Sequence, residues 1–214
     1  MEILNRISEK LQLGESEEVG PLTQEALNQG LPPAEVLQGG LIAGMQVVGA
    51  RFRQHELFLP DVLLAARAMY AGMDVLKPHF VGGRMPTRGK VILGTVKGDL
   101  HDIGKNLVGI MLRGSGFEVI DLGKDVAPEK FVAAVHETGA RIVGMSALLT
   151  TTMPIMREVI ERLRLDGLLG KVRTVIGGAP LSAEYAAEIG ADAYAYDGAN
   201  AVERVSELIR SLES

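Results

Sequence analysis

Two patterns of apolar residues divide the chain. Up to about residue 80, apolar side chains recur at mixed three- and four-residue spacing, which is typical of amphipathic helices. We expect helices over 15–28 and 34–53, and a third that begins at Pro60 and ends at Pro78. With a short helix near the amino terminus, they predict a small four-helix bundle over residues 1–80.

Four glycines stand in the second of these helices, at positions 39, 40, 44 and 49. Each costs ~1 kcal/mol against alanine inside a helix, so a compensating reason is expected. Two reasons remain open from the sequence: another backbone packs closely against this helix, or a flat ligand approaches it.

From Lys90 onward, short apolar runs alternate with amphipathic stretches. The apolar runs predict strands at 91–96, 118–121, 142–146, 172–176 and 193–196. The amphipathic stretches predict helices near 103–115, 128–138, 152–166, 182–189 and 199–211. Five such units indicate an α/β fold, a parallel sheet with helices on both faces. We expect the flavodoxin-like, Rossmann-like strand order 2-1-3-4-5, with a ligand crevice between the first and third strands.

Between the two patterns lies a segment rich in glycine, proline and charge, residues 81–89. Such a composition without periodicity is typical of a linker. We therefore expect two domains, a helical one over 1–80 and an α/β one over 90–214.

Composition excludes several classes of function. The net charge of −5 and the pI near 5.5 argue against a nucleic-acid surface, which needs clustered Lys and Arg. No apolar run approaches the ~18 residues that span a membrane, and residues 1–6 lack the pattern of a secretory signal. Cysteine is absent, which excludes disulfides and thiolate sites. We expect a cytoplasmic protein that binds neither nucleic acid nor membrane.

Small and polar residues gather where the predicted strands end. The loop after the first strand holds His101 between two carboxylates, Asp99 and Asp102. Three further loops, 146–154, 177–180 and 196–200, follow the third, fourth and fifth strands. In open α/β sheets ligands bind at this edge, so these loops are the predicted site.

Simple alternatives for the first loop fit poorly. As a phosphate-binding P-loop, the segment from Gly98 to Gly104 has one residue too many, and Asn106 stands where Ser or Thr should bind magnesium. A phospho-acceptor Asp99 would need an acidic pair early in the domain, and a zinc site would need more His or Cys ligands near His101. A loop histidine can be purely structural, but a carboxylate two residues away can orient it as a ligand.

These loops together resemble the cobalamin-binding module of cobalamin-dependent methionine synthase and of the small corrinoid proteins of methylotrophic methyltransferase systems. The family signature is D-x-H-x-x-G, then S-x-L, then G-G. In this chain it reads Asp99-x-His101-x-x-Gly104, Ser146-x-Leu148 and Gly177-Gly178. The resemblance covers nearly the whole chain, because the helical domain precedes the module in the expected place.

The resemblance implies a role for each part of the signature. His101 would replace the cofactor's own nucleotide base as the lower cobalt ligand, with Asp99 on the other imidazole nitrogen and Thr152 in place of a serine that extends the relay. The displaced tail would thread between the loops of Ser146 and Gly177-Gly178. The implied cofactor contacts of this domain are Gly98, Asp99, His101, Asp102, Ile103, Gly104, Ser146, Leu148, Thr150, Thr152, Gly177, Gly178 and Gly198.

The helical domain resembles the family's cap over the methyl-bearing face of the cofactor. By that resemblance Phe52, Leu59 and Val62 would cover the methyl group and exclude water. The alternative is that these three are only core residues of the bundle. Gln38 departs from the family pattern, which has an acidic residue at this position.

The function implied is that of a non-catalytic methyl carrier. A substrate-specific methyltransferase would load the methyl group onto the cobamide, a second methyltransferase would pass it to tetrahydrofolate or coenzyme M, and a reductive activase would keep the cobalt competent. The alternatives are a cobalamin-dependent sensor or regulator, part of an adenosylcobalamin mutase, and a flavodoxin-like domain without cobalamin. The methyl donor is not indicated by the sequence.

Overall fold

The computed structural model describes residues 2–80 and 85–213 and divides into two compact units. The first comprises the chain up to Thr87 together with 114–116, and the second comprises 88–113 and 117–214. The predicted linker, 81–89, lies partly outside the described residues, since 81–84 are not among them.

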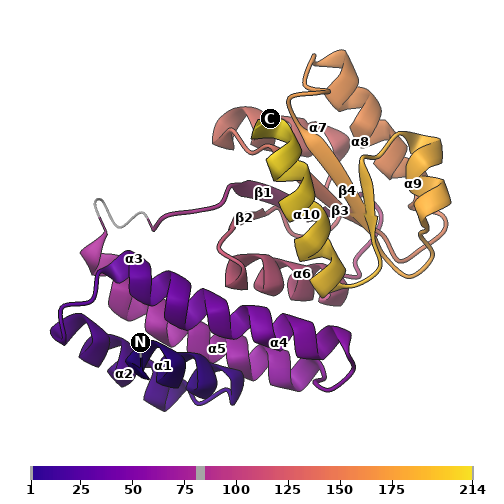
Figure 1. The fold of residues 1–214 in the computed structure, drawn as a ribbon. Helices are drawn as coiled ribbons and strands as arrows, with labels where there is room; N and C mark the ends of the chain where they lie inside the picture. The colour runs from indigo at the N-terminus through magenta and orange to yellow at the C-terminus, as the bar shows by residue number, and fades with distance from the viewer. Residues whose placement is uncertain (1, 81–84, 214) are drawn as a thin grey trace. The chain divides into compact units, whose positions relative to one another are not determined.

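The first unit is helical, as predicted (Figure 1). Its elements are α1 (Glu2–Gln12), α2 (Ser16–Asn28), α3 (Pro33–Val36), the π-helical η1 (Leu37–Ile42), α4 (Ala43–Arg53), α5 (Leu59–Leu76) and the short 3-10 helix η2 (Lys77–His79). From α3 through η1 to α4 the helix is unbroken, because the residues at the junctions keep right-handed helical dihedral angles. The four-helix bundle expected from the sequence is confirmed.

Three of the four unusual glycines are explained by close packing on α1. A Cβ at Gly40 would stand 3.0 Å from Cγ2 of Ile7, and one at Gly44 would stand 3.1 Å from the carbonyl oxygen of Ser8. At Gly39 the nearest atom would be Cδ1 of Leu4, at 3.1 Å. Of the two reasons open from the sequence, the approach of another helix is the one found at these positions.

The second unit is a five-stranded parallel sheet with helices between the strands (Figure 1). The strands are β1 (Lys90–Thr95), β2 (Glu118–Asp121), β3 (Ile142–Ser146), β4 (Arg173–Gly177) and β5 (Ala193–Ala195), in the order β2-β1-β3-β4-β5. The helices are α6 (Ile103–Gly114), α7 (Pro128–Thr138), α8 (Pro154–Leu165), α9 (Ala183–Ile189) and α10 (Gly198–Glu213). The predicted strand order is confirmed.

Each face of the sheet has its own core. On one face, Ile92 and Met145 pack with Phe131 of α7 and Ile160 of α8. On the other face, apolar residues of the strands pack with α6 and α10; this core contains Val91, Leu93, Leu112, Ile142, Val175, Val205 and Ile209. Both faces are thus covered, and the sheet edge at the carboxyl ends of the strands is left for the loops.

Small differences in element boundaries follow from turn chemistry. The sequence predicts a helix from Thr152, but α8 begins at Pro154, because proline is favoured in the first turn and the residues before it form turns. The helix predicted from Pro60 begins one residue earlier, at Leu59, where the backbone N–H of Phe58 bonds to the carboxylate of Asp61.

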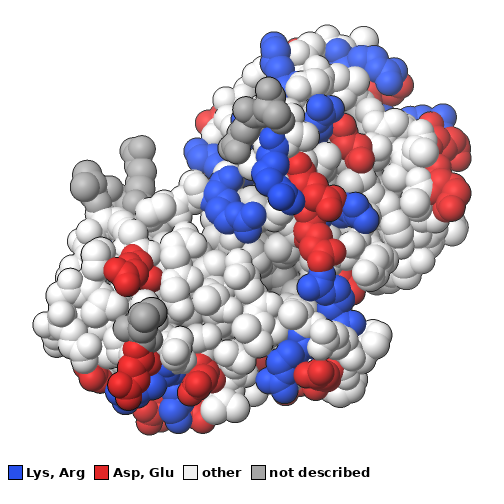
Figure 2. Space-filling model, viewed as in Figure 1, with Lys and Arg blue, Asp and Glu red and all other residues white. Residues whose placement is uncertain are grey.

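In the view of Figure 2, acidic and basic side chains lie next to one another in patches, and broad areas between these patches carry neither. Of the helices that are described, none is long and apolar enough to cross a membrane.

Candidate functional site

The site is built around the carboxylate of Asp99, in the loop that follows β1. Asp99 is fully buried, and its Oδ1 accepts the backbone N–H of His101 at 3.0 Å. The same oxygen lies 2.8 Å from Nδ1 of the His101 ring. One carboxylate oxygen therefore fixes both the backbone and the side chain of the histidine.

The other oxygen of Asp99 joins this loop to the loop after β3. Oδ2 accepts the backbone N–H groups of Leu148, at 2.7 Å, and Leu149, at 3.1 Å. It also accepts the hydroxyl of Thr152 at 2.8 Å, and that hydroxyl lies 2.9 Å from the Leu149 carbonyl. The chain of contacts His101–Asp99–Thr152 is present as predicted.

These hydrogen bonds keep Asp99 ionised despite its burial. Desolvation by burial acts to raise the pKa of Asp99, and the donors from His101, Leu148 and Thr152 act to lower it. The donors prevail together, so the pKa of Asp99 lies well below its usual range. At neutral pH the group beside the His101 ring is a carboxylate anion.

The anion determines which nitrogen of His101 can bind a metal. An ionised carboxylate only accepts hydrogen bonds, so Nδ1 of the ring carries the proton that it shares with Asp99. In the neutral imidazole, Nε2 then keeps its lone pair, and no hydrogen bond joins it to the described residues. The side chain of His101 is 52% exposed, so an external metal centre can reach it.

The surroundings of His101 fit a large, flat and mostly apolar ligand. Leu100 and Ile103 flank the histidine and are 61% and 74% exposed, and Leu148 and Leu149 on the next loop are also exposed. Apolar side chains gathered around one polar group are typical of a ligand site. A Cβ at Gly104 would have no atom within 4 Å, so close packing inside the protein does not explain this glycine.

The loops after β3 and β4 are in close contact. A Cβ at Gly178 would stand 1.9 Å from the carbonyl oxygen of Ala147, so only glycine fits there, and its φ of +143° also favours glycine. Ser146 is half-buried, and its carbonyl accepts the N–H of Val96 at 3.0 Å. Gly177 is paired with Ser146 in the sheet register. The three predicted residues therefore line the junction of these two loops.

Other predicted residues vary in their exposure. Ile103 and Thr150 are exposed at the sheet edge, and Asp102 is half-buried. Gly198 is buried, and a Cβ there would stand 2.6 Å from Sδ of Met111, so packing on α6 gives a reason for this glycine. Its contact with a cofactor stays a prediction.

The predicted cap residues lie on α4 and α5. Val62 is fully buried, as expected of a core residue of the bundle. Phe52 and Leu59 are half-buried. The structure thus gives Val62 a packing role, and a position over the methyl group stays a prediction for all three.

Two polar contacts beside the site were missed from the sequence. Lys105 has a side chain that is only 2% exposed, and its Nζ lies 2.6 and 2.7 Å from the two carboxylate oxygens of Asp121 and 2.8 Å from Oδ1 of Asn106. Asp125 accepts a hydrogen bond from the N–H of Gly98. No pattern indicated these contacts, because charged residues are ordinarily expected to face solvent.

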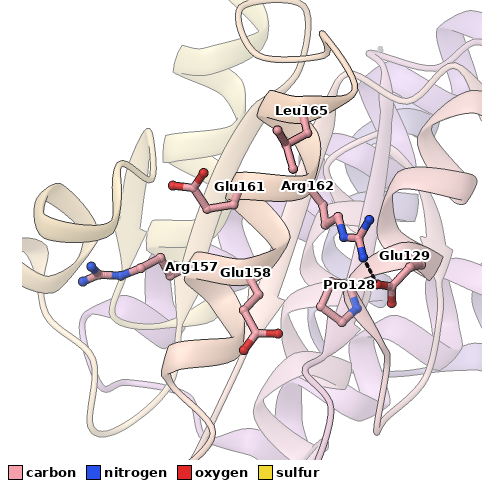
Figure 3. A pocket seen from close by; sticks show the side chains of 7 residues that line it. All are labelled: Pro128, Glu129, Arg157, Glu158, Glu161, Arg162 and Leu165. Carbon is pink, nitrogen blue, oxygen red and sulfur yellow. Dashed lines mark hydrogen bonds and ion pairs between the residues drawn. The ribbon is translucent and has the colours of Figure 1, made fainter.

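A separate hollow of about 290 Å³ lies between α7 and α8 (Figure 3). Its lining is charged, and Arg162 is paired with Glu129 across it at 2.8 Å. Arg157 is paired with Glu188 of α9. Both arginines that line this hollow therefore already have acidic partners.

The residues described contain no group of three or more His, Asp or Glu side chains that could hold a metal ion. His101 is therefore suited to a metal that arrives with its other ligands already in place. A cobalt ion in a corrin ring is such a metal, and His101, the apolar rim and the open space at Gly104 fit it.

Comparison with known proteins agrees with this geometry. Residues 89–206 match a family model described as a B12 binding domain, and residues 3–77 match a second model with the same description. The chain is 41% identical to a corrinoid protein of Desulfitobacterium hafniense, over 98% of both chains. It is 43% identical to trimethylamine corrinoid protein 2 of Methanosarcina acetivorans, again over 98% of both. With dimethylamine corrinoid protein 2 of Methanosarcina mazei it shares 45% identity, over 86% of this chain and 87% of that protein.

Solved structures show the same likeness. A methanol:cobalamin methyltransferase complex from Methanosarcina barkeri contains a chain that matches with a TM-score of 0.89 and 31% identity, over 98% of this chain and 80% of that one. A cobalamin-binding protein from Desulfitobacterium hafniense matches with a TM-score of 0.80 and 33% identity, over 96% and 98%. The chain described here therefore belongs to the family of corrinoid proteins built from B12 binding domains.

Proposed function

We propose that this protein carries a methyl group on the cobalt of a bound cobamide, between a methyltransferase that loads it and one that unloads it. The observation that carries the proposal is the Asp99–His101 pair, which leaves Nε2 of an exposed imidazole ready to bind a metal. The relatives support it, because they include corrinoid proteins for dimethylamine and trimethylamine and a chain of a methanol:cobalamin methyltransferase complex.

Each residue of the site has a separate role in the proposed function. When bound, the cobamide supplies the cobalt that accepts and releases the methyl group. His101 would hold that cobalt through Nε2, and Asp99 keeps the ring proton on Nδ1. Thr152 keeps the Asp99 carboxylate in place. Because the proton lies between His101 and Asp99, binding and release of the histidine can be coupled to proton uptake at this pair.

The remaining loops would hold the periphery of the cofactor. The exposed leucines 100, 148 and 149 and Ile103 would contact the corrin, and Gly104 would let it approach the start of α6. The displaced nucleotide tail would lie along the junction of the β3 and β4 loops. On the helical unit, Phe52 and Leu59 are better placed by their exposure than the buried Val62 to cover the methyl group.

The protein is proposed to act as a subunit without turnover of its own. A substrate-specific methyltransferase is the partner that the relatives support. A second methyltransferase for tetrahydrofolate or coenzyme M, a reductive activase and a cytoplasmic location are further parts of the proposal. The relatives named above give no support to the alternative of a sensor.

Absorbance spectroscopy tests the cofactor and the ligand together. Wild type, His101→Ala and His136→Ala are mixed with hydroxocobalamin and desalted. His136 is an exposed histidine on α7, so its variant controls for loss of a histidine outside the site. We expect all three to retain cobalamin, with an altered spectrum only in His101→Ala. A colourless wild type would refute cofactor binding, and three identical spectra would refute the role of His101.

A second experiment tests the transfer itself. The loaded protein is reduced and mixed with candidate methyltransferases and methylated amines or methanol, and formation of the methylated cofactor is followed by its absorbance. The proposal expects methylation that depends on both the donor and the enzyme. Retention of cobalamin without methylation by any donor would leave a binding protein and contradict the carrier.

A further inference from the structure

Asp125 has a backbone conformation that few residues with a side chain adopt. Its φ is +56°, and His55 is the other described residue besides glycine with a positive φ. The left-handed region is unfavourable for L-amino acids and mildest for Asp and Asn, so something in the fold must hold Asp125 there. Strain of this kind is a reason to look for a role.

The role follows from two hydrogen bonds to one dipeptide. Oδ1 of Asp125 accepts the N–H of Gly98 at 2.7 Å, and the N–H of Asp125 donates to the carbonyl oxygen of Asp99 at 3.1 Å. Asp125 therefore brackets Gly98–Asp99 from both ends. The left-handed turn is what lets its own N–H and its own carboxylate face the same segment.

The segment that carries Asp125 is itself fixed. Beyond the end of β2, the N–H of Leu122 donates to Leu93 at 2.8 Å, and Gly123 accepts from the N–H of Thr95 at 3.0 Å. The N–H of Val126 donates back to the carbonyl of Thr95 at 3.0 Å. These bonds continue the pairing of β2 with β1 into the loops, so Asp125 is held from a backbone that is already ordered.

The bracketed dipeptide is the one on which His101 depends. Asp99 carries the carboxylate that orients the imidazole, and Gly98 precedes it with a φ of +83°. At the far end of the loop, the hydroxyl of the buried Thr95 donates to the carbonyl of His101 at 3.2 Å. The loop is thus held at its end by Thr95 and at its start by Asp125.

We propose that Asp125 is a positioning residue for cobalt ligation: it fixes the Gly98–Asp99 dipeptide and so aims the His101 ring at the metal. This inference rests on the proposed function, and it concerns a residue whose hydrogen bonds go to Gly98 and Asp99 and not to the His101 ring. Outer partners of a metal-binding histidine change affinity by about 10–100-fold when they are lost, which sets the expected scale.

Stability and positioning can be separated here because Gly98 and Asp125 are exposed. When the carboxylate is removed, water can bond to the N–H of Gly98, so the fold loses little. The order of the loop is lost, however, since water does not hold the dipeptide in one place. A positioning role therefore predicts a large effect on the cofactor and a small one on unfolding.

The experiment compares three variants of the full chain. Asp125→Gly tolerates the left-handed backbone and lacks the acceptor, whereas Asp125→Asn keeps an acceptor oxygen and a tolerance for positive φ. Lys124→Ala alters the exposed neighbour and serves as the control. Each is titrated with hydroxocobalamin for its Kd, the bound spectrum is compared with that of His101→Ala, and amide exchange of Gly98 is measured without cofactor.

We expect Asp125→Gly to raise the Kd about tenfold, to move the spectrum toward that of His101→Ala and to speed exchange at Gly98. Asp125→Asn should stay within about threefold of wild type, and Lys124→Ala should be unchanged. Wild-type affinity and spectrum in Asp125→Gly would overturn the inference, as would equal effects from Lys124→Ala. If wild type binds no cobalamin, the proposed function fails, and unchanged Gly98 exchange in Asp125→Gly would show separately that Asp125 does not hold the loop.

Discussion

The hydroxyl of Thr152 donates to Oδ2 of Asp99 at 2.8 Å, across 53 positions of sequence. This bond joins the loop after β1 to the loop after β3, and both partners are buried. It places a hydroxyl at the end of the contacts that begin at His101. A substitution at Thr152 can therefore perturb the His101 ring through Asp99, without changing either of these two residues.

Thr152→Val should lower the free energy of unfolding by about 1 kcal/mol, because it removes this bond and leaves the shape nearly unchanged. It should also change the absorbance of bound cobalamin, since Asp99 is held less firmly. Thr152→Ser keeps the hydroxyl and should retain the wild-type spectrum. Identical spectra for Val and Ser would count against a relay through Thr152.

Asp99→Asn should lower the free energy of unfolding by about 1–3 kcal/mol, measured by denaturant titration at pH 7. The buried amide cannot accept all the donors of His101, Leu148, Leu149 and Thr152, so at least one of them loses its partner. An unfolding free energy equal to that of wild type would contradict the role of this carboxylate as the centre of the site.

The stability of the protein should also depend on pH through Asp99. Its pKa in the folded protein is below its unfolded value of about 3.9, so the folded state favours the ionised form. Its contribution is fully present above about pH 5 and is lost as pH falls below about 4 toward the folded pKa. Between pH 6 and pH 3, wild type should therefore lose about 1 kcal/mol more than Asp99→Asn. Parallel pH profiles for the two proteins would refute this.

Substitution of two glycines of the site by alanine should affect stability to very different extents. Gly178→Ala would bring a Cβ to within 1.9 Å of the Ala147 carbonyl at a φ of +143°, so we expect a loss of about 3 kcal/mol or failure to fold. In Gly104→Ala the new Cβ meets no atom within 4 Å, and the residue lies in α6. Its free energy of unfolding, measured by thermal denaturation, should therefore differ from that of wild type by at most about 1 kcal/mol.

If Gly104 is open in order to admit the corrin, Gly104→Ala should still weaken binding of cobalamin, by about tenfold. The Kd is obtained from absorbance titration of the folded variant. Wild-type affinity would show that this glycine is not needed for the cofactor.

In the pair of Lys105 and Asp121, removal of the carboxylate should destabilise the protein more than removal of the ammonium group. Asp121→Ala leaves an ammonium group that is 2% exposed without its carboxylate, at a cost of about 3 kcal/mol. Lys105→Met should cost less, because the Asp121 side chain is 30% exposed and water can reach it. Chemical unfolding of both variants and of the double variant gives the coupling free energy between the two side chains. A larger loss in Lys105→Met would contradict this account.

Sequence periodicity was enough to predict the strand order and the helical unit, because buried strands and amphipathic helices leave repeating patterns. The contact of His101 with Asp99 could also be expected, since the two lie in one short loop. The bond to Thr152 was suggested only by the resemblance. The predicted helix start at Thr152 was two residues early, because Thr152 lies in the turn before Pro154, where its hydroxyl bonds to Asp99.

Other features leave no such trace. A buried lysine looks like any surface lysine in a sequence, and its partner Asp121 is 16 positions away. Asp125 gives no local signal for its positive φ, because that conformation is fixed by bonds to the neighbouring loop. The burial of Val62 depends on how the helices pack rather than on its motif.

The contact between Gly178 and Ala147 has a mechanical consequence. Where a backbone carbonyl fills the place of a missing side chain, neither loop can advance without pushing the other. The loops after β3 and β4 are therefore expected to move together and not independently. A ligand that lay along this junction would therefore meet a surface whose width is fixed by the protein itself.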